Sequence, residues 1–202
     1  MSTHIALTRS ITEVGRAIRR PEELAIRWRD RLNDAEHSPH ALIFFVLLVN
    51  AVAGTAVYGL VMHMHRGPEG MLEGALLMPL AAGIAWTITL PALYIINSVF
   101  GSRLDFTSTA LAATITVSFG AAAMLAGVPI TWFFSLALPF DIFRWLTHII
   151  VFAGVGFCMS DVFLRVMRAL EPNRTNPYPL VWLALLTFVG AEFFWLLGVF
   201  DF

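Results

Sequence analysis

Five long apolar stretches constrain the fold of this chain more than any other feature of its sequence. A helix needs about 20 residues to cross the hydrocarbon layer of a bilayer, which is about 30 Å thick. Inside that layer every backbone polar group must be bonded within the protein, and a helix achieves this within one segment. The sequence therefore predicts an all-α integral membrane protein. Its five transmembrane helices are expected at about residues 41–63, 77–99, 106–126, 141–163 and 180–199.

The composition agrees with this prediction and excludes several classes of protein. Of 202 residues, 58% are hydrophobic and only 13% are charged, which is more apolar than a typical soluble domain. A formal net charge of −1 argues against a nucleic-acid-binding protein, because such proteins are basic. The lone Cys158 excludes an internal disulfide and a thiolate metal cluster. All 13 cations are arginine, which we interpret as the codon bias of a bacterial genome.

Arginine placement predicts the orientation in the bacterial cytoplasmic membrane. Loops on the cytoplasmic side of a membrane carry an excess of positive residues. Seven arginines precede the first apolar stretch, and further arginines follow the second and fourth stretches. The opposite side has only Arg66 and, at the edge of a span, Arg144. The N-terminus is therefore expected in the cytoplasm and the C-terminus outside. The stretch VPITWFFSLALP after the third span is too short to cross and is expected to form an interfacial or re-entrant connector.

Residues 1–40 are predicted to form an amphipathic, helical cytoplasmic segment that precedes the membrane domain, 41–202. Ser10 and Glu13 form a capping box for a helix over 10–20, and Pro21 begins a second helix over 21–34. The second helix lies either on the inner leaflet or against a cytoplasmic protein partner, since both uses need one apolar stripe. Its predicted docking residues are Leu24, Trp28 and Leu32 in the stripe, with Arg27 and Arg31 on another face.

Small and polar residues predict how the spans pack. In the third span a small residue recurs at every fourth position from 110 to 126, and such residues let helix backbones approach closely in lipid. This span is therefore expected at the centre of the bundle. Asn50 in the first span is expected to form an interhelical hydrogen bond. Pro91 is expected to kink the second span, and Asp161 and Arg165 are expected to form a local ion pair.

The fourth span contains three polar residues on one helical face, within the sequence LPFDIFRWLTHIIVF. Asp141, Arg144 and His148 are spaced by three and four residues, and Glu192 in the fifth span is expected at a similar depth. Burying any one of these groups alone in lipid would cost a few kcal/mol, so mutual pairing is favoured. The sequence predicts an intramembrane polar cluster of these four residues between the fourth and fifth spans.

Three roles are open for this cluster. It is a structural ion pair, a proton or substrate site, or a place where His148 binds a haem or a metal. The third role is disfavoured because a second histidine at matching depth is not apparent, and His63 and His65 point apart on a helix. No metal site and no cofactor are therefore predicted.

The stretch LPALYIINSVFGSRLDF resembles a pattern in small bacterial membrane proteins of the Yip1-like type, as does the downstream GVPITWFF. The matching residues are Pro91, Leu93, Tyr94, Asn97, Gly101, Ser102 and Leu104. The resemblance covers roughly residues 77–170. It implies five spans after a cytoplasmic segment and a role as an adaptor that recruits or anchors partners at a bilayer.

The sequence favours a non-enzymatic function. It contains no P-loop, no dinucleotide glycine fingerprint, no nucleophile elbow and no HExxH motif. The leading hypothesis is a membrane anchor, adaptor or assembly subunit that packs against protein partners. Two alternatives remain: a small transporter or channel subunit that uses the polar cluster, and an accessory membrane subunit of a redox complex.

Overall fold

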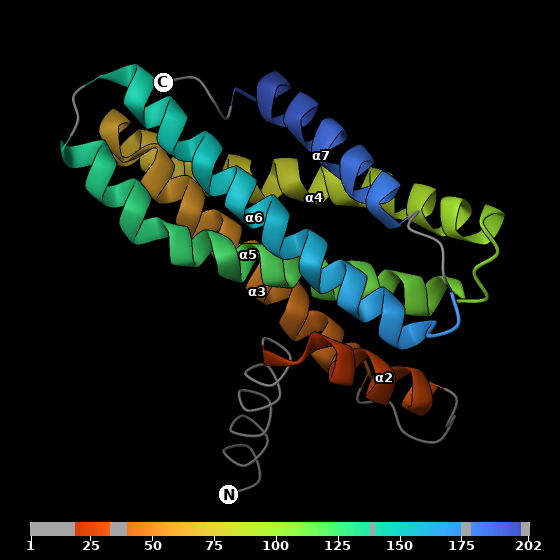
Figure 1. Cartoon of the computed structure of the whole chain (residues 1–202). Helices are drawn as coiled ribbons and strands as arrows, with labels where there is room; N and C mark the ends of the chain where they lie inside the picture. Colours follow the sequence, from red (N-terminus) through yellow and green to blue (C-terminus); the bar gives the residue numbers. More distant parts are fainter. Residues whose placement is uncertain (1–18, 33–39, 138–139, 175–178, 199–202) are drawn as a thin grey trace, which may run out of the picture.

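The computed structural model describes residues 19–32, 40–137, 140–174 and 179–198 (Figure 1). Within these ranges it leaves the side chains of 28, 30–32, 40–43 and 179–180 undescribed. The described residues form helices and short connections, and no strand occurs among them. The helices are α2 (Pro21–Leu32), α3 (His40–Met62), the short 3₁₀-helix η1 (Met64–Arg66), α4 (Gly67–Val99), α5 (Phe106–Ala137), α6 (Asp141–Leu170) and α7 (Pro179–Leu196).

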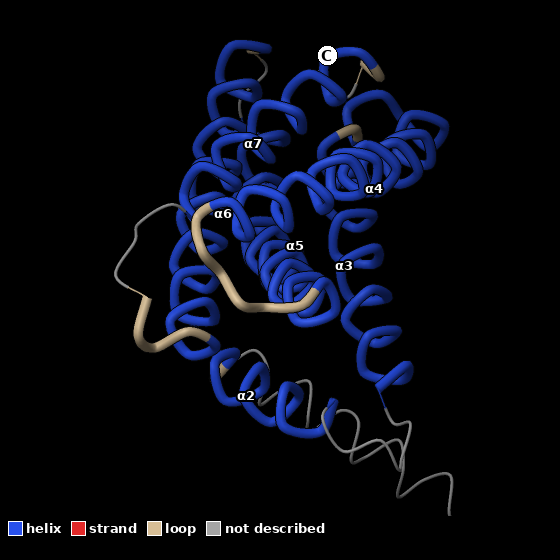
Figure 2. The backbone as a smooth tube through the Cα atoms, turned by 90° about the vertical axis from the view of Figure 1, so that its right-hand side faces the viewer, coloured by secondary structure: helices blue, strands red, loops and turns tan. Residues whose placement is uncertain are grey.

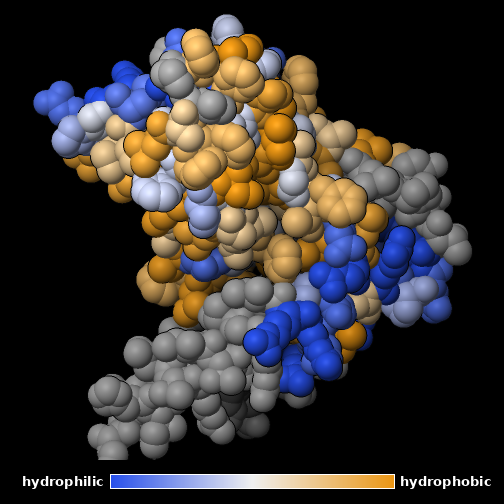
Figure 3. Space-filling model, turned by 60° about the vertical axis from the view of Figure 1, so that its left-hand side comes forward, coloured by the Kyte–Doolittle hydropathy of each residue, from blue (hydrophilic) through white to orange (hydrophobic). Residues whose placement is uncertain are grey.

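Helices α3 to α7 run alternately up and down in one bundle, and α2 lies across one end of it (Figures 1 and 2). We call the end next to α2 the inner end and the end that carries η1 the outer end. Four helical segments are long and apolar enough to cross a membrane: Phe44–Met62, Met64–Val99, Phe106–Ala137 and Asp141–Leu170. Helix α7 supplies a shorter apolar segment, Val181–Leu196, so the fifth span stays a prediction. Hydrophobic side chains cover the body of the molecule, and hydrophilic ones gather toward its ends (Figure 3).

Two boundaries differ from the sequence prediction. The stretch expected to be a connector after the third span is helical instead, since α5 continues to Ala137 with Pro129 inside it. Helix α4 likewise begins at Gly67 rather than at residue 77 and contains both Pro79 and Pro91. Proline is tolerated within membrane helices because neighbouring groups satisfy the carbonyl that it frees. The proline and aromatic residues used to place these boundaries therefore did not end the helices.

Helix α5 is the centre of the bundle, as its small residues predicted. It packs between α3 and α6, and its residues from Ser108 to Thr116 are all buried. Asn50 of α3 donates hydrogen bonds to the backbone carbonyl and the side-chain oxygen of Ser118, at 3.0 and 2.8 Å. This confirms the predicted interhelical bond and fixes the register of α3 against α5.

Glycines allow α3 to approach both of its neighbours closely. A Cβ added at Gly59 would clash with the backbone carbonyl of Gly74 in α4. A Cβ added at Gly54 would lie 2.8 Å from the carbonyl oxygen of Ala121 in α5. Both neighbours are backbone atoms, which cannot rotate away as a side chain can. Helix α3 is therefore held at two backbone-to-backbone crossings.

Helix α7 packs mainly against α4 and contacts α6 much less. Its fully buried Trp182 donates a hydrogen bond from Nε1 to the carbonyl of Thr89 in α4, at 2.9 Å. The Trp182 ring also stacks at a tilt on Phe163 of α6, with ring centroids 4.8 Å apart. This anchor lies in the inner half of the bundle. Farther along the two helices, the rings of Phe152 in α6 and Phe194 in α7 lie 5.7 Å apart, and both residues line an apolar cavity.

Candidate functional site

The outer half of the bundle contains a buried hydrogen-bonded chain across three helices. Thr131 of α5 donates to the hydroxyl of Tyr58 in α3 at 3.3 Å, and that hydroxyl lies 3.0 Å from Nδ1 of His148 in α6. All three side chains are buried. The direction of the Tyr58–His148 bond depends on the histidine tautomer, and either direction joins α3 to α6. The three side chains thus link α3, α5 and α6 within the helix packing.

Two more histidines lie close to this chain. His63 is fully buried at the end of α3, with Nδ1 3.0 Å from the carbonyl of Gly59. His63, His65 and Arg144 all lie within electrostatic range of His148. Even so, the described part of the chain contains no metal site. None of its histidine, cysteine, aspartate and glutamate side chains form a group of three that could hold a metal ion. The geometry supports a role for His148 in helix packing.

The predicted cluster between α6 and α7 is only partly assembled. Asp141 and Arg144 form an ion pair at the outer end of α6. His148 instead turns toward α3, and its partner Tyr58 was not predicted. Glu192 is exposed on α7, where it forms no ion pair with any described residue. The reason is the arrangement of the helices, since α7 packs against α4 and not against the polar face of α6.

Tyr58 is the residue that the sequence argument missed. Depth along each helix was used to match His148 with Glu192, but Tyr58 lies at a comparable depth, one turn before the end of α3. A buried tyrosine hydroxyl needs a hydrogen-bond partner, and this requirement was the available signal. Gly127 of α5 completes the contact, since a Cβ there would lie 2.7 Å from Val151 and 3.8 Å from the Tyr58 ring.

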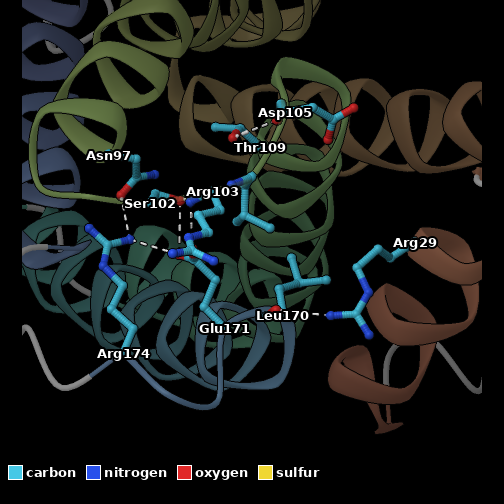
Figure 4. Close-up of polar contacts among 10 residues, drawn as sticks. Arg29, Asn97, Ser102, Arg103, Asp105, Thr109, Leu170, Glu171 and Arg174 are labelled. Carbon is cyan, nitrogen blue, oxygen red and sulfur yellow. Dashed lines mark hydrogen bonds and ion pairs between the residues drawn. The ribbon is translucent and has the colours of Figure 1, made fainter.

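The inner end carries a second polar network, between the loop after α4 and the end of α6 (Figure 4). Glu171 accepts hydrogen bonds from the Ser102 hydroxyl, the Arg103 backbone N–H and Arg174, each at 2.9 Å. Arg174 also donates to the side-chain oxygen of Asn97 at 3.2 Å. The loop turns at Gly101, whose φ of +80° favours glycine. The Glu171 carboxylate thus joins the loop between α4 and α5 to the residues that follow α6.

Helix α2 is attached to this inner end by both apolar and polar contacts. Leu24 and Ala25 are buried in the same core as Phe163 of α6. Arg29 donates to the carbonyl of Leu170 at 3.0 Å, and Glu22 lies 3.7 Å from Arg165 of α6. Each contact joins α2 to the last two turns of α6. The helix is therefore part of the folded bundle.

This attachment changes the interpretation of the predicted docking residues. Leu24 is 7% exposed and packs inside the bundle, so it is not available to a partner. Arg27 is exposed, and its guanidinium lies 3.8 Å from Glu23. Glu23 also accepts a hydrogen bond from Arg20, which raises the pKa of Arg20. Trp28, Arg31 and Leu32 lie on α2, but their side chains are outside the described part.

A large apolar cavity lies within the bundle, between α3 to α6 on one side and α7 on the other. Its volume is about 560 Å³, within the range of ligand sites. Aliphatic, aromatic and small residues form most of its wall, among them Ala85, Phe152, Met159 and Leu186. This cavity could not be predicted from the sequence, because alanine and glycine residues, which usually indicate close packing of helices, also line it.

Comparison with models of protein families, with curated proteins and with solved structures gives no match to this chain. The resemblance to Yip1-like proteins therefore stays a prediction. Two of the residues that carry it have structural roles in this fold. Asn97 accepts from Arg174, and Gly101 provides the turn after α4.

Proposed function

We propose that this protein is a non-enzymatic anchor or assembly subunit of the bacterial cytoplasmic membrane, which presents α2 and the neighbouring inner loops to a cytoplasmic protein partner. The observation that carries the proposal is the attachment of α2 to the end of α6. Its buried residues Leu24 and Ala25 and the Arg29–Leu170 hydrogen bond hold the helix in one place. A helix fixed in this way is preorganised, which lowers the entropic cost of binding a partner.

The proposal includes five spans with the N-terminus in the cytoplasm. Arginines at the inner end outnumber those at the outer end, which supports this orientation under the positive-inside rule. Helix α7 has 18 residues and is therefore about 27 Å long, close to the thickness of the hydrocarbon layer. A fifth crossing therefore needs only a few residues beyond the ends of α7 to match the thickness of the hydrocarbon layer.

The chemistry of the exposed inner surface favours an acidic partner. Exposed arginines lie just before α2, on α2, on the loop after α4 and on α6, at the end of the bundle where α2 is attached. They are Arg19, Arg20, Arg27, Arg103 and Arg168. Arginine recognises carboxylates through two parallel hydrogen bonds and is enriched at binding hot spots. We therefore expect a partner with surface aspartate or glutamate residues.

Site-specific photo-crosslinking in cells tests this function. A photoreactive amino acid at position 27, on the exposed side of α2, is expected to form a discrete adduct with one protein. The same amino acid at position 95, where Ile95 is 59% exposed on α4, serves as the lipid-facing control and is expected to form none. Charge reversal by Arg19→Glu and Arg168→Glu should reduce the adduct at position 27. Lipid adducts alone at position 27 would contradict the proposal.

The transporter alternative receives less support from the geometry. It requires His148 and Glu192 to act at one site, but His148 bonds to α3 whereas Glu192 is exposed on α7. The Glu192→Gln variant separates the two functions. The anchor proposal expects an unchanged adduct at position 27, and transport would instead appear as altered flux in reconstituted vesicles.

A further inference from the structure

We propose that the apolar cavity binds a single hydrocarbon chain of a bilayer lipid, which enters sideways between α6 and α7. The inference rests on the membrane placement within the proposed function and is independent of the cytoplasmic partner. A cavity of 560 Å³ is the size of a site for one ligand. The mouth of the cavity, its glycines and its polar groups all fit a hydrocarbon chain.

The mouth of the cavity faces the lipid. Four of its lining residues are exposed, Ile149 and Ala153 on α6 and Thr187 and Ala191 on α7. These residues come from facing positions on two helices that touch little. All lie within apolar helical segments, so the medium at the mouth is the hydrocarbon layer of the bilayer. A lipid chain can therefore reach the cavity without crossing a polar surface.

Two glycines of the cavity wall lack the close neighbours that glycines have where two helices cross. A Cβ at Gly156 of α6 would meet no atom within 4 Å, and one at Gly190 of α7 would lie 4.0 Å from the Cβ of Ala85. By contrast, a Cβ at Gly54, where α3 crosses α5, would lie 2.8 Å from the carbonyl oxygen of Ala121. Small residues usually allow membrane helices to touch. At Gly156 and Gly190 the absence of a side chain instead leaves part of the cavity open, and no neighbouring side chain fills it.

The polar groups of the wall do not call for water or a lipid headgroup. The hydroxyls of Thr55, Ser160 and Thr187 each donate to a carbonyl one turn earlier in their own helix, at 2.8 Å. The buried Nε1 of Trp86 has no hydrogen-bond partner among the described residues. A buried water needs two to four polar partners, so one indole N–H does not retain it. The wall therefore fits a hydrocarbon chain.

Photo-crosslinking with a lipid probe tests this site. Cells are grown with a palmitic acid analogue that carries a diazirine on its chain and an alkyne for detection, and the cells incorporate it into their phospholipids. After irradiation, the labelled residues are mapped by mass spectrometry. We expect labelling on the facing segments of α6 and α7 that line the cavity, including Met159 and Phe194, which lie inside the mouth.

Two glycines on one helix provide a matched pair of variants. Gly156→Leu projects a side chain into the cavity and is expected to reduce labelling of the lining residues at least fivefold. Gly154→Leu places the same side chain in open space on the exposed face of α6, outside the cavity, and should leave that labelling unchanged. Membrane fractionation and size-exclusion chromatography establish that both variants fold.

A second pair of variants keeps the test decisive if Gly156→Leu fails to fold. Gly190→Leu fills the cavity from α7, and Gly83→Leu adds a side chain in open space on α4. Equal labelling in folded Gly156→Leu and Gly190→Leu variants would overturn the lipid-chain site, as would crosslinks from cavity positions to a second protein chain. Absence of the wild-type protein from the membrane fraction would overturn the membrane placement. Loss of the protein adduct at position 27, with lipid labelling retained, would contradict only the anchor proposal.

Discussion

The two ends of the bundle are fixed by different kinds of contact. At the inner end, charged groups join separate helices and loops: Glu22 meets Arg165, and Glu171 meets Arg174 and the loop after α4. At the outer end the ion pairs are local, as between Asp141 and Arg144. The contacts between helices there are neutral and buried, and the Tyr58–His148 hydrogen bond is the main example.

This difference follows from the surroundings of each end. Water near the inner end lowers the desolvation cost of charged groups, so ion pairs can connect α2, the loops and α6. In the apolar outer half the same charges would cost several kcal/mol, and glycine crossings and neutral hydrogen bonds replace them. The arginines that remain exposed at the inner end form the surface that we propose for a partner.

Gly74→Leu should have the largest effect, because Gly74 lies against both the Gly59 backbone and the His63 ring. Overpacking usually costs about 1–3 kcal/mol, and more is expected where the obstacle is backbone. We predict loss of monodisperse protein in membrane extracts, measured by size-exclusion chromatography. Gly83→Leu on the same helix has open space and should behave like the wild type. Normal yield of Gly74→Leu would refute the close crossing of α3 and α4.

Tyr58→Phe should have the next largest effect, since it removes the hydroxyl that joins Thr131 to His148. An unsatisfied buried polar group costs about 1–3 kcal/mol, so we predict a stability loss of about 2 kcal/mol. Thermal unfolding in detergent measures it. Tyr94→Phe is the control, because the partly exposed Tyr94 ring keeps its edge contact with Phe106. Similar losses in both variants would show that the buried chain contributes nothing specific.

Glu171→Gln tests the inner network. The variant keeps an acceptor oxygen but loses the charge opposite Arg174, and we predict a loss of about 1 kcal/mol that shrinks as salt is added. Glu73→Gln, in the exposed outer pair with Arg66, should cost less than about 0.5 kcal/mol. Chemical denaturation at two salt concentrations compares them. An equal cost at both ends would remove the proposed distinction.

Asn50 lies between the two ends, and its removal should have the smallest effect. Hydrogen bonds between membrane helices contribute about 0.6 kcal/mol on average. A double-mutant cycle of Asn50→Ala and Ser118→Ala is expected to give a coupling energy of this size. The Ser118 carbonyl remains as an acceptor in the Ser118→Ala variant, so the cycle isolates the hydroxyl contact. A coupling near zero would leave the register of α3 and α5 to packing alone.

Much of the fold could be predicted because apolar length and small-residue spacing are local properties of the chain. Apolar length predicted α3, and small-residue spacing predicted the central position of α5. Proline at the first helical position predicted the start of α2 at Pro21, and a lone amide in an apolar span predicted the hydrogen bond of Asn50. The ion pair of Asp161 and Arg165 was also predicted from its spacing and is confirmed at 3.1 Å.

The candidate sites could not be predicted equally well because they depend on which helices are neighbours. Depth along a helix placed His148 and Glu192 at one level but gave no direction around the helix axis. The structure pairs His148 with α3 and α7 with α4, so the two residues separate. For the same reason an apolar stripe on α2 did not reveal that Leu24 packs inside the bundle.

Cysteine labelling in cells tests on which side of the membrane each end of the bundle lies. In a Cys158→Ala background, Arg27→Cys and Arg66→Cys each place one exposed thiol at the inner or the outer end. A membrane-impermeant maleimide is applied to intact and to permeabilised cells. Position 66 is expected to react in intact cells, and position 27 only after permeabilisation. The reverse pattern would place α2 outside the cytoplasm and refute the proposed orientation.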